Sequence, residues 1–198
     1  MFIIGIDLAG SEKRDTGFCI LKNGKADVKI LHSDAEILFR IKELKGTKLI
    51  GIDAPLSMPI GRKSLEKRSD IHFRQCDLAL RTLGIRFFPI TLGPMRLLTK
   101  RGIELKKKIL RADKKAEIFE IYPGATYDVF GLPRKNRQAI LKWIERMIKI
   151  NSPRTYTQDE LDAMAAAITI KLHTESRTIE LGNKLEGQII VPDKANEI

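Results

Sequence analysis

The chain has 198 residues, 43% of them hydrophobic, and a formal net charge of +11. This length and apolar content are enough for one buried core, so they exclude global disorder and indicate a single domain, residues 1–198. Two cysteines and three scattered histidines exclude a disulfide framework and a zinc site. No apolar run approaches the ~18–20 residues of a membrane helix, and the first residues lack the basic start of a signal peptide, so we expect a cytoplasmic protein.

The excess of positive charge points to an anionic partner. A field of this sign favours nucleic acid, either DNA or RNA, as that partner. The alternative is a protein from a heat-loving organism that is rich in Lys, Glu and Ile and is basic for no functional reason. Charge alone favours nucleic acid and gives no indication of the structure that is bound.

The first part of the chain predicts three strands, a helix and a fourth strand. Asn23-Gly24 predicts a hairpin turn, because both residues accept a positive φ. Ser33 and Glu36 form a capping box that starts the helix, and Pro55 stops the last strand. The predicted elements lie at residues 2–7, 17–22, 26–32, 33–45 and 48–53.

Two of these strands end on the same acid, Asp7 in the first and Asp53 in the fourth. After a crossover helix, the strand at 48–53 should lie parallel to an earlier strand, most simply the first. Neighbouring strands lie about 4.8 Å apart, so the two carboxylates would emerge side by side at the carboxyl edge of the sheet. Open α/β sheets bind their ligands at this edge. A turn-capping role explains either aspartate alone and explains the pair less well.

Residues 56–115 interrupt the regular pattern and predict a basic helical insertion. A polar loop precedes a helix at 72–84, and the stretch 94–115 is helical and dense in Lys and Arg. We expect this region to hold the phosphate backbone of a nucleic acid, although a solvated helix face explains any single lysine equally well. The side chains predicted to contact nucleic acid are Arg74, Arg81, Arg96, Lys100, Arg101, Lys106 and Lys107.

The remainder of the chain predicts a strand, two helices and a terminal hairpin, at residues 116–122, 132–149, 157–173 and 178–192. Thr157 and Glu160 form a second capping box at the start of the last helix. Asp159 suits the first turn of that helix, where the dipole favours an anion. Asp162 has no such explanation, because it borders the apolar stripe of the helix. The alanines at 163 and 165–167 would let this helix approach the sheet closely.

Carboxylates that converge cannot all remain ionised, because like charges and burial raise their pKa values. Hard oxygen ligands favour Mg²⁺ or Mn²⁺, and two such ions can activate a water and stabilise the leaving oxygen of a phosphodiester. Glu120, on the strand at 116–122, is a further candidate ligand or else pairs with a lysine. We expect metal ligands at Asp7, Asp53, Asp159, Asp162 and Glu120, with Asp7, Asp53 and Asp162 as the catalytic residues.

The motifs GIDLAGS, GIDAPLS, RQCDLALR, EIYP and DELDAMAAA together resemble an uncharacterised family, domain of unknown function 429. The pattern also resembles the Holliday-junction resolvase branch of the ribonuclease H-like fold. The resemblance implies an α/β protein with a ribonuclease H-like mixed sheet, three antiparallel strands followed by parallel ones, with flanking helices. It implies a metal-dependent nuclease with ligands at Asp7, Asp53, Asp162 and Asp159, and a functional placement of Arg74, Cys76, Asp77 and Arg81. The resolvase branch usually has Glu where this chain has Asp53.

Two other functions remain open at this point. An actin-like or sugar-kinase-like phosphotransferase shares the order of the first elements, and DLAGSEKRDTG resembles its phosphate loop, but this chain is too short for the duplicated fold unless it forms a homodimer. A non-catalytic nucleic-acid-binding module would keep the acids for a structural ion only. The sequence shows no aromatic RNA-recognition motif and no helix-turn-helix.

Overall fold

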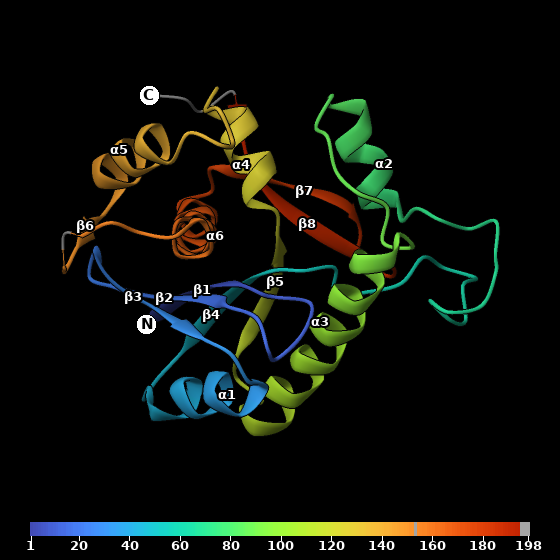
Figure 1. The fold of residues 1–198 in the computed structure, drawn as a ribbon, viewed down its shortest axis with the longest axis horizontal. Coiled ribbons are helices and arrows are strands. Elements are labelled where there is room, and N and C mark those ends of the chain that lie inside the picture. Colours follow the sequence, from blue (N-terminus) through green and yellow to red (C-terminus); the bar gives the residue numbers. More distant parts are fainter. Residues whose placement is uncertain (153, 195–198) are drawn as a thin grey trace.

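A computed structural model describes residues 1–152 and 154–194, which form one mixed sheet of eight strands with helices on both faces (Figure 1). The strands are β1 (Phe2–Asp7), β2 (Thr16–Lys22), β3 (Lys25–Leu31), β4 (Lys48–Asp53), β5 (Glu117–Ile121), β6 (Lys149–Ile150), β7 (Thr178–Asn183) and β8 (Gly187–Pro192). The helices are α1 (Asp34–Glu43), α2 (Gln75–Thr82), α3 (Gly93–Ala112), α4 (Pro123–Val129), α5 (Arg137–Met147) and α6 (Gln158–Thr174). Within the described residues, no helix is long and apolar enough to span a membrane.

The strand order is β6-β3-β2-β1-β4-β5-β8-β7. The first three strands are antiparallel neighbours, and β4 and β5 continue the sheet parallel to β1. This is the predicted mixed sheet, with three antiparallel strands followed by parallel ones, and the parallel pairing of the first and fourth strands is confirmed. The terminal hairpin also forms, and it extends the same sheet because β8 pairs in parallel with β5.

Each face of the sheet is covered by its own layer of helices. Figure 1 shows α1 and α3 on one side and α5 and α6 on the other. The alternation along β1 divides its residues between two cores, with Ile4 and Ile6 facing α1 and α3 and Ile3 facing α5 and α6. Leu105 and Ile109 place the second half of α3 in the first of these cores. The predicted basic insertion is therefore partly a structural layer of the domain.

Glycines in three central strands allow α6 to lie directly on the sheet. A Cβ atom at Gly5 would come 2.0 Å from the carbonyl oxygen of Ala163, and one at Gly17 would come 1.9 Å from that of Asp159. Gly51 of β4 lies under the next turns of the helix. Glycine inside a strand marks such a close approach of another backbone. The contact brings the first turns of α6 to the carboxyl ends of β1 and β4.

Two predicted capping boxes are confirmed, and one predicted helix is shorter than expected. Ser33 and Thr157 each cap a helix together with the Glu three residues later. The helix predicted at 132–149 begins only at Arg137, and a separate short helix, α4, precedes it. Pro123 opens α4 at its first position, where the missing N–H costs nothing.

Candidate active site

Asp7 and Asp53 end adjacent parallel strands in exact register. The two residues are paired Cα partners, as are Ile6 and Ile52 before them. Both isoleucines are fully buried, whereas both aspartates keep some exposure to solvent. The pleat of the strands therefore ends the hydrophobic core on one residue and presents a pair of carboxylates on the next, as the sequence predicts.

Asp159 and Asp162 approach this pair from the beginning of α6. The carboxylate of Asp162 accepts a hydrogen bond from the hydroxyl of Tyr127 at 2.6 Å and another from the Nε2 of Gln158 at 2.8 Å. Glu160 lies between the two aspartates in sequence but points away from them. Its carboxylate is buried against Arg154 and accepts the N–H of Thr157 at 3.0 Å. The capping box thus fixes the start of the helix that carries both candidate ligands.

The four aspartates repel one another. Burial raises the pKa of Asp7 well above its usual value, and the charges of Asp53, Asp162 and Asp159 raise it further, together with a hydrogen bond to the Asp159 carboxyl. Burial and the Asp162 charge likewise raise the pKa of Asp53. Burial raises the pKa of Asp162 to about 6, against the lowering effect of the Tyr127 and Gln158 hydrogen bonds. A carboxylate cluster of this kind is stabilised by a positive charge placed among its members.

The donor chemistry of these side chains fits a hard divalent cation such as Mg²⁺ or Mn²⁺, which prefers carboxylate oxygens. The arrangement itself is not a closed ligand shell. Among the described residues, no group of three or more His, Cys, Asp or Glu side chains is placed so as to hold a metal ion. The hydrogen bonds that Asp162 accepts from Tyr127 and Gln158 both end on its Oδ1.

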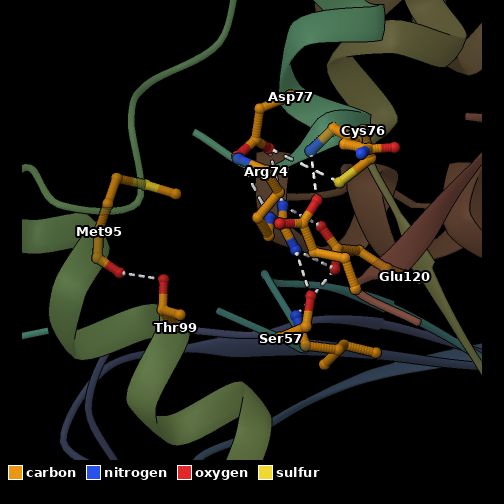
Figure 2. Close-up of polar contacts among 10 residues, drawn as sticks. Ser57, Arg74, Cys76, Asp77, Met95, Thr99 and Glu120 are labelled. Carbon is orange, nitrogen blue, oxygen red and sulfur yellow. Dashed lines mark hydrogen bonds and ion pairs between the residues drawn. The ribbon is translucent and has the colours of Figure 1, made fainter. Parts of the chain in front are cut away.

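Glu120 is not free to act as the additional ligand. Its Oε1 and Oε2 each accept a hydrogen bond from the Arg74 guanidinium at 2.7 Å, and Oε2 also accepts the N–H of Leu56 at 2.8 Å (Figure 2). The partner is therefore an arginine, not a lysine. The Glu120 carboxylate contributes to the raised pKa of Asp53, after burial and Asp162, so it borders the acid cluster without joining it.

The prediction that Arg74 contacts phosphate needs the same correction. Its side chain is only 1% exposed and forms ion pairs with both Glu120 and Asp77. Cys76 is also buried, and burial raises the pKa of its thiol to about 12, so the thiol stays protonated. Figure 2 shows these side chains gathered between α2 and β5. The RQCD motif therefore anchors α2 to the sheet.

The other residues predicted to bind nucleic acid lie in different environments. Arg101 is buried, where its guanidinium donates to Asp34 at 2.9 Å and to the carbonyl oxygens of Ala9 and His32, so it braces α3 against the β1–β2 loop and the start of α1. The prediction for Arg101 is therefore corrected. The exposed members of the set are Arg81, Arg96, Lys100 and Lys107, and Lys106 is partly exposed.

The sequence reading missed a different basic surface beside the acids. Asp53 and Asp162 line a pocket of about 460 Å³ together with Arg134, Lys135 and Arg137. Lys135 and Arg137 are exposed, and no ion-pair partner is found for either among the described residues. Tyr122, Tyr127 and Gln158 complete the polar lining. The run RKNR at 134–137 was the available signal, but a basic run at a helix start usually indicates only a solvated surface.

Comparisons with known proteins give a family and a solved structure of low sequence identity. No curated protein is found to match the sequence. Among solved structures, the chain is similar to the Thermus thermophilus RuvC structure, with 9% identity over 89% of this chain and 96% of that one and a TM-score of 0.45. The model of one family, described as a protein of unknown function, DUF429, matches residues 5–184. The chain therefore belongs to the DUF429 family.

Proposed function

We propose that this protein is a nuclease that depends on Mg²⁺ or Mn²⁺ and hydrolyses phosphodiester bonds of DNA or RNA. The observation that carries the proposal is the set of four mutually repelling aspartates at the ends of β1, β4 and α6, beside an exposed basic rim. Acids with raised pKa values in a pocket are typical of functional sites. The formal net charge of +11 supports an anionic substrate.

Asp7, Asp53 and Asp162 have the central role in this proposal, and Asp159 has a supporting one. Asp7 and Asp53 would anchor the divalent ions, and Asp162 would complete the ligand set. The bound ions would supply an activated water and charge stabilisation for the leaving oxygen. The chain itself would hold the substrate, with Lys135 and Arg137 placed to contact phosphates on the open side of the pocket.

The test is cleavage of labelled single-stranded DNA, duplex DNA, branched DNA and RNA–DNA hybrid with Mg²⁺, Mn²⁺ or chelator. We expect cleavage of at least one substrate with metal, none with chelator, and none by Asp7→Asn or Asp53→Asn. Asp27→Asn is the matched control, because Asp27 is exposed on β3, far from the cluster, and should retain full activity. Equal cleavage by wild type and Asp7→Asn would overturn the proposal, because it would indicate a contaminating enzyme.

The same preparation tests the two alternatives. ATP hydrolysis without cleavage of any nucleic acid would indicate a phosphotransferase. Oligonucleotide binding that persists in chelator, with no turnover of any substrate, would indicate a binding module.

A further inference from the structure

A second pocket lies beside the acid site, and its lining combines aromatic rings with arginines. Phe73, Phe87 and Phe88 contribute the rings, and Arg81 and Arg86 contribute the charge. Its volume is about 560 Å³, within the range of about 300–1,000 Å³ that is typical of small-molecule sites. No carboxylate is found in this lining among the described residues, so the pocket suits an anionic ligand with a flat apolar part.

The aromatic rings of this pocket are partly fixed and partly free. Phe73 and Phe87 meet edge to face, with ring centroids 6.1 Å apart and planes at 87°. The Arg81 guanidinium lies over the Phe73 ring at 4.3 Å from its centroid. Phe88 is different, since it is 67% exposed although it adjoins this packed cluster. A large ring left in water beside a preorganised pocket is available for stacking.

Tyr122 and Arg134 join this pocket to the acid site, because both side chains line both pockets. The Arg134 Nη1 donates to the Tyr122 hydroxyl at 2.7 Å and to the Arg86 carbonyl oxygen at 2.9 Å. The Tyr122 hydroxyl in turn donates to the same carbonyl oxygen at 2.7 Å. The two side chains therefore form a braced ridge, with the aspartates on one side and the phenylalanines on the other.

We propose that the aromatic pocket holds the base of an unpaired nucleotide, whose neighbouring phosphodiester would lie over the aspartates. Every nucleobase offers a flat face to an aromatic ring, and arginines beside the ring attract the attached phosphate. In a duplex both faces of a base are covered by its neighbours, so a base enters the pocket only from a single strand or after it has been unstacked. The proposal names the substrate class of the proposed nuclease, single-stranded or locally unpaired nucleic acid, and rests on that function for its link to cleavage.

The experiment measures binding in excess chelator, so that no cleavage is involved. Fluorescence anisotropy would follow the binding of a labelled oligothymidylate of about 12 nucleotides, a duplex of the same length, and a single strand of the same length that lacks bases. The variants are Phe88→Ala, Phe88→Trp and the control Phe39→Ala. Phe39 is a suitable control because it is also a largely exposed phenylalanine, at 61%, but lies on α1, on the other side of the sheet.

We expect Phe88→Ala to bind oligothymidylate about tenfold more weakly than wild type, since one stacked base is lost. Its affinity for the duplex and for the baseless strand should not change. Phe88→Trp should retain the affinity of wild type, and Phe39→Ala should bind all three probes as wild type does. Equal oligothymidylate affinity in wild type and Phe88→Ala, or an equal loss in Phe39→Ala, would overturn the proposal.

Two further outcomes separate this proposal from its alternatives. If Phe88→Ala alters self-association in analytical ultracentrifugation but not oligothymidylate binding, the pocket holds a second copy of the chain and the proposal fails. If oligothymidylate binding depends on Phe88 but no substrate is cleaved with Mg²⁺ or Mn²⁺, the nuclease proposal fails and the base pocket stands. If cleavage occurs while Phe88→Ala binds oligothymidylate normally, the base pocket alone fails.

Discussion

Arg74 and Glu120 form a two-pronged ion pair between α2 and β5, with both N–O distances at 2.7 Å and both side chains buried. Glu120 also holds the N–H of Leu56, three residues after Asp53, so the pair ties α2 to the turn that follows β4. Removing one partner of a buried pair leaves an uncompensated charge, which costs about 3–5 kcal/mol. We therefore expect Arg74→Met to lower the free energy of unfolding by about that amount, measured by urea denaturation.

The control for the ion pair is Arg81→Met, because Arg81 is exposed on the same helix and should change the stability by less than about 1 kcal/mol. The double variant Arg74→Met, Glu120→Gln should recover part of the loss, since only one of the two carboxylates that Arg74 neutralises, that of Asp77, then remains buried and unpaired. If Arg74→Met were as stable as Arg81→Met, the anchoring role of the RQCD motif would be wrong.

The aspartate cluster should destabilise the metal-free protein at neutral pH. Burial and like charge raise the pKa of Asp7, so ionisation of this group costs folding energy. We expect Asp7→Asn to raise the free energy of unfolding in chelator by about 1 kcal/mol or more. Added Mn²⁺ should raise the melting temperature of wild type and have a much smaller effect on Asp7→Asn. A lower stability of Asp7→Asn in chelator would mean that the aspartate has a structural role, as a turn cap would.

The contact between α6 and the sheet predicts a strong effect at Gly5. A Cβ atom there would lie 2.0 Å from a backbone oxygen of α6, so the helix would have to move. We expect Gly5→Ala to lower the free energy of unfolding by about 1–3 kcal/mol or more and to reduce cleavage, because Asp159 and Asp162 move with the helix.

Gly93→Ala is the comparison for Gly5→Ala. Gly93 begins α3 with nothing near the position of a Cβ atom, so the substitution should leave stability unchanged or raise it by up to about 1 kcal/mol. Equal stabilities for the two variants, measured in the same denaturation experiment, would contradict the packing that we describe.

The two basic surfaces can be distinguished by charge reversal. Lys135 lines the acid pocket, whereas Lys107 is exposed on α3, in the region favoured by the sequence reading. We expect Lys135→Glu to weaken oligonucleotide binding and to reduce the slope of log affinity against log salt by about one, as the loss of one phosphate contact does. Lys107→Glu should have the smaller effect, and a larger effect at Lys107 would restore α3 as the phosphate-binding element.

The buried ion pair between Arg101 and Asp34 should affect how the free energy of unfolding changes with pH in the acid range. Burial acts to raise the pKa of Asp34, but hydrogen bonds from Lys108 and Arg101 outweigh it and hold this pKa below its usual value. The unfolded chain therefore binds more protons below about pH 4, and the stabilisation is lost as the pH falls through the folded-state pKa. Asp34→Asn should lower the free energy of unfolding at neutral pH, and this free energy should then decrease less than that of wild type as the pH falls. Denaturant unfolding at several pH values would measure both effects. An unchanged acid profile would contradict this ion pair.

The sequence predicts every strand except β6, the parallel pairing of β1 and β4, and the convergence of Asp7 and Asp53, because these features depend on local patterns. Apolar runs that end on an acid, a crossover helix and two capping boxes are all written within a few neighbouring residues. The ion pair between Glu120 and Arg74 could not be predicted from local patterns, since it joins residues 46 positions apart. A lone buried charge and a solvated one look the same in a sequence.

The basic rim and the aromatic pocket were missed for a related reason. Arg134 and Tyr122 come from one segment, and Phe73, Arg86 and Phe88 come from another. Only the packing of α2 and its flanking loops on the sheet brings them together. The glycines of β1, β2 and β4 offered a better signal. A glycine in the middle of a buried strand has no side chain to pack, so it indicates the close approach of another backbone.

The helix that packs on these glycines, α6, also determines when the candidate site is complete during folding. Both strand-end aspartates lie within the first 53 residues, but α6, which covers β1, β2 and β4, starts only at Gln158. Contacts between such distant parts of a chain form late, because closing the intervening loop costs entropy. During synthesis on the ribosome, Asp7 and Asp53 would therefore lie without the aspartates of α6 until the final quarter of the chain had been synthesised and had packed on the sheet.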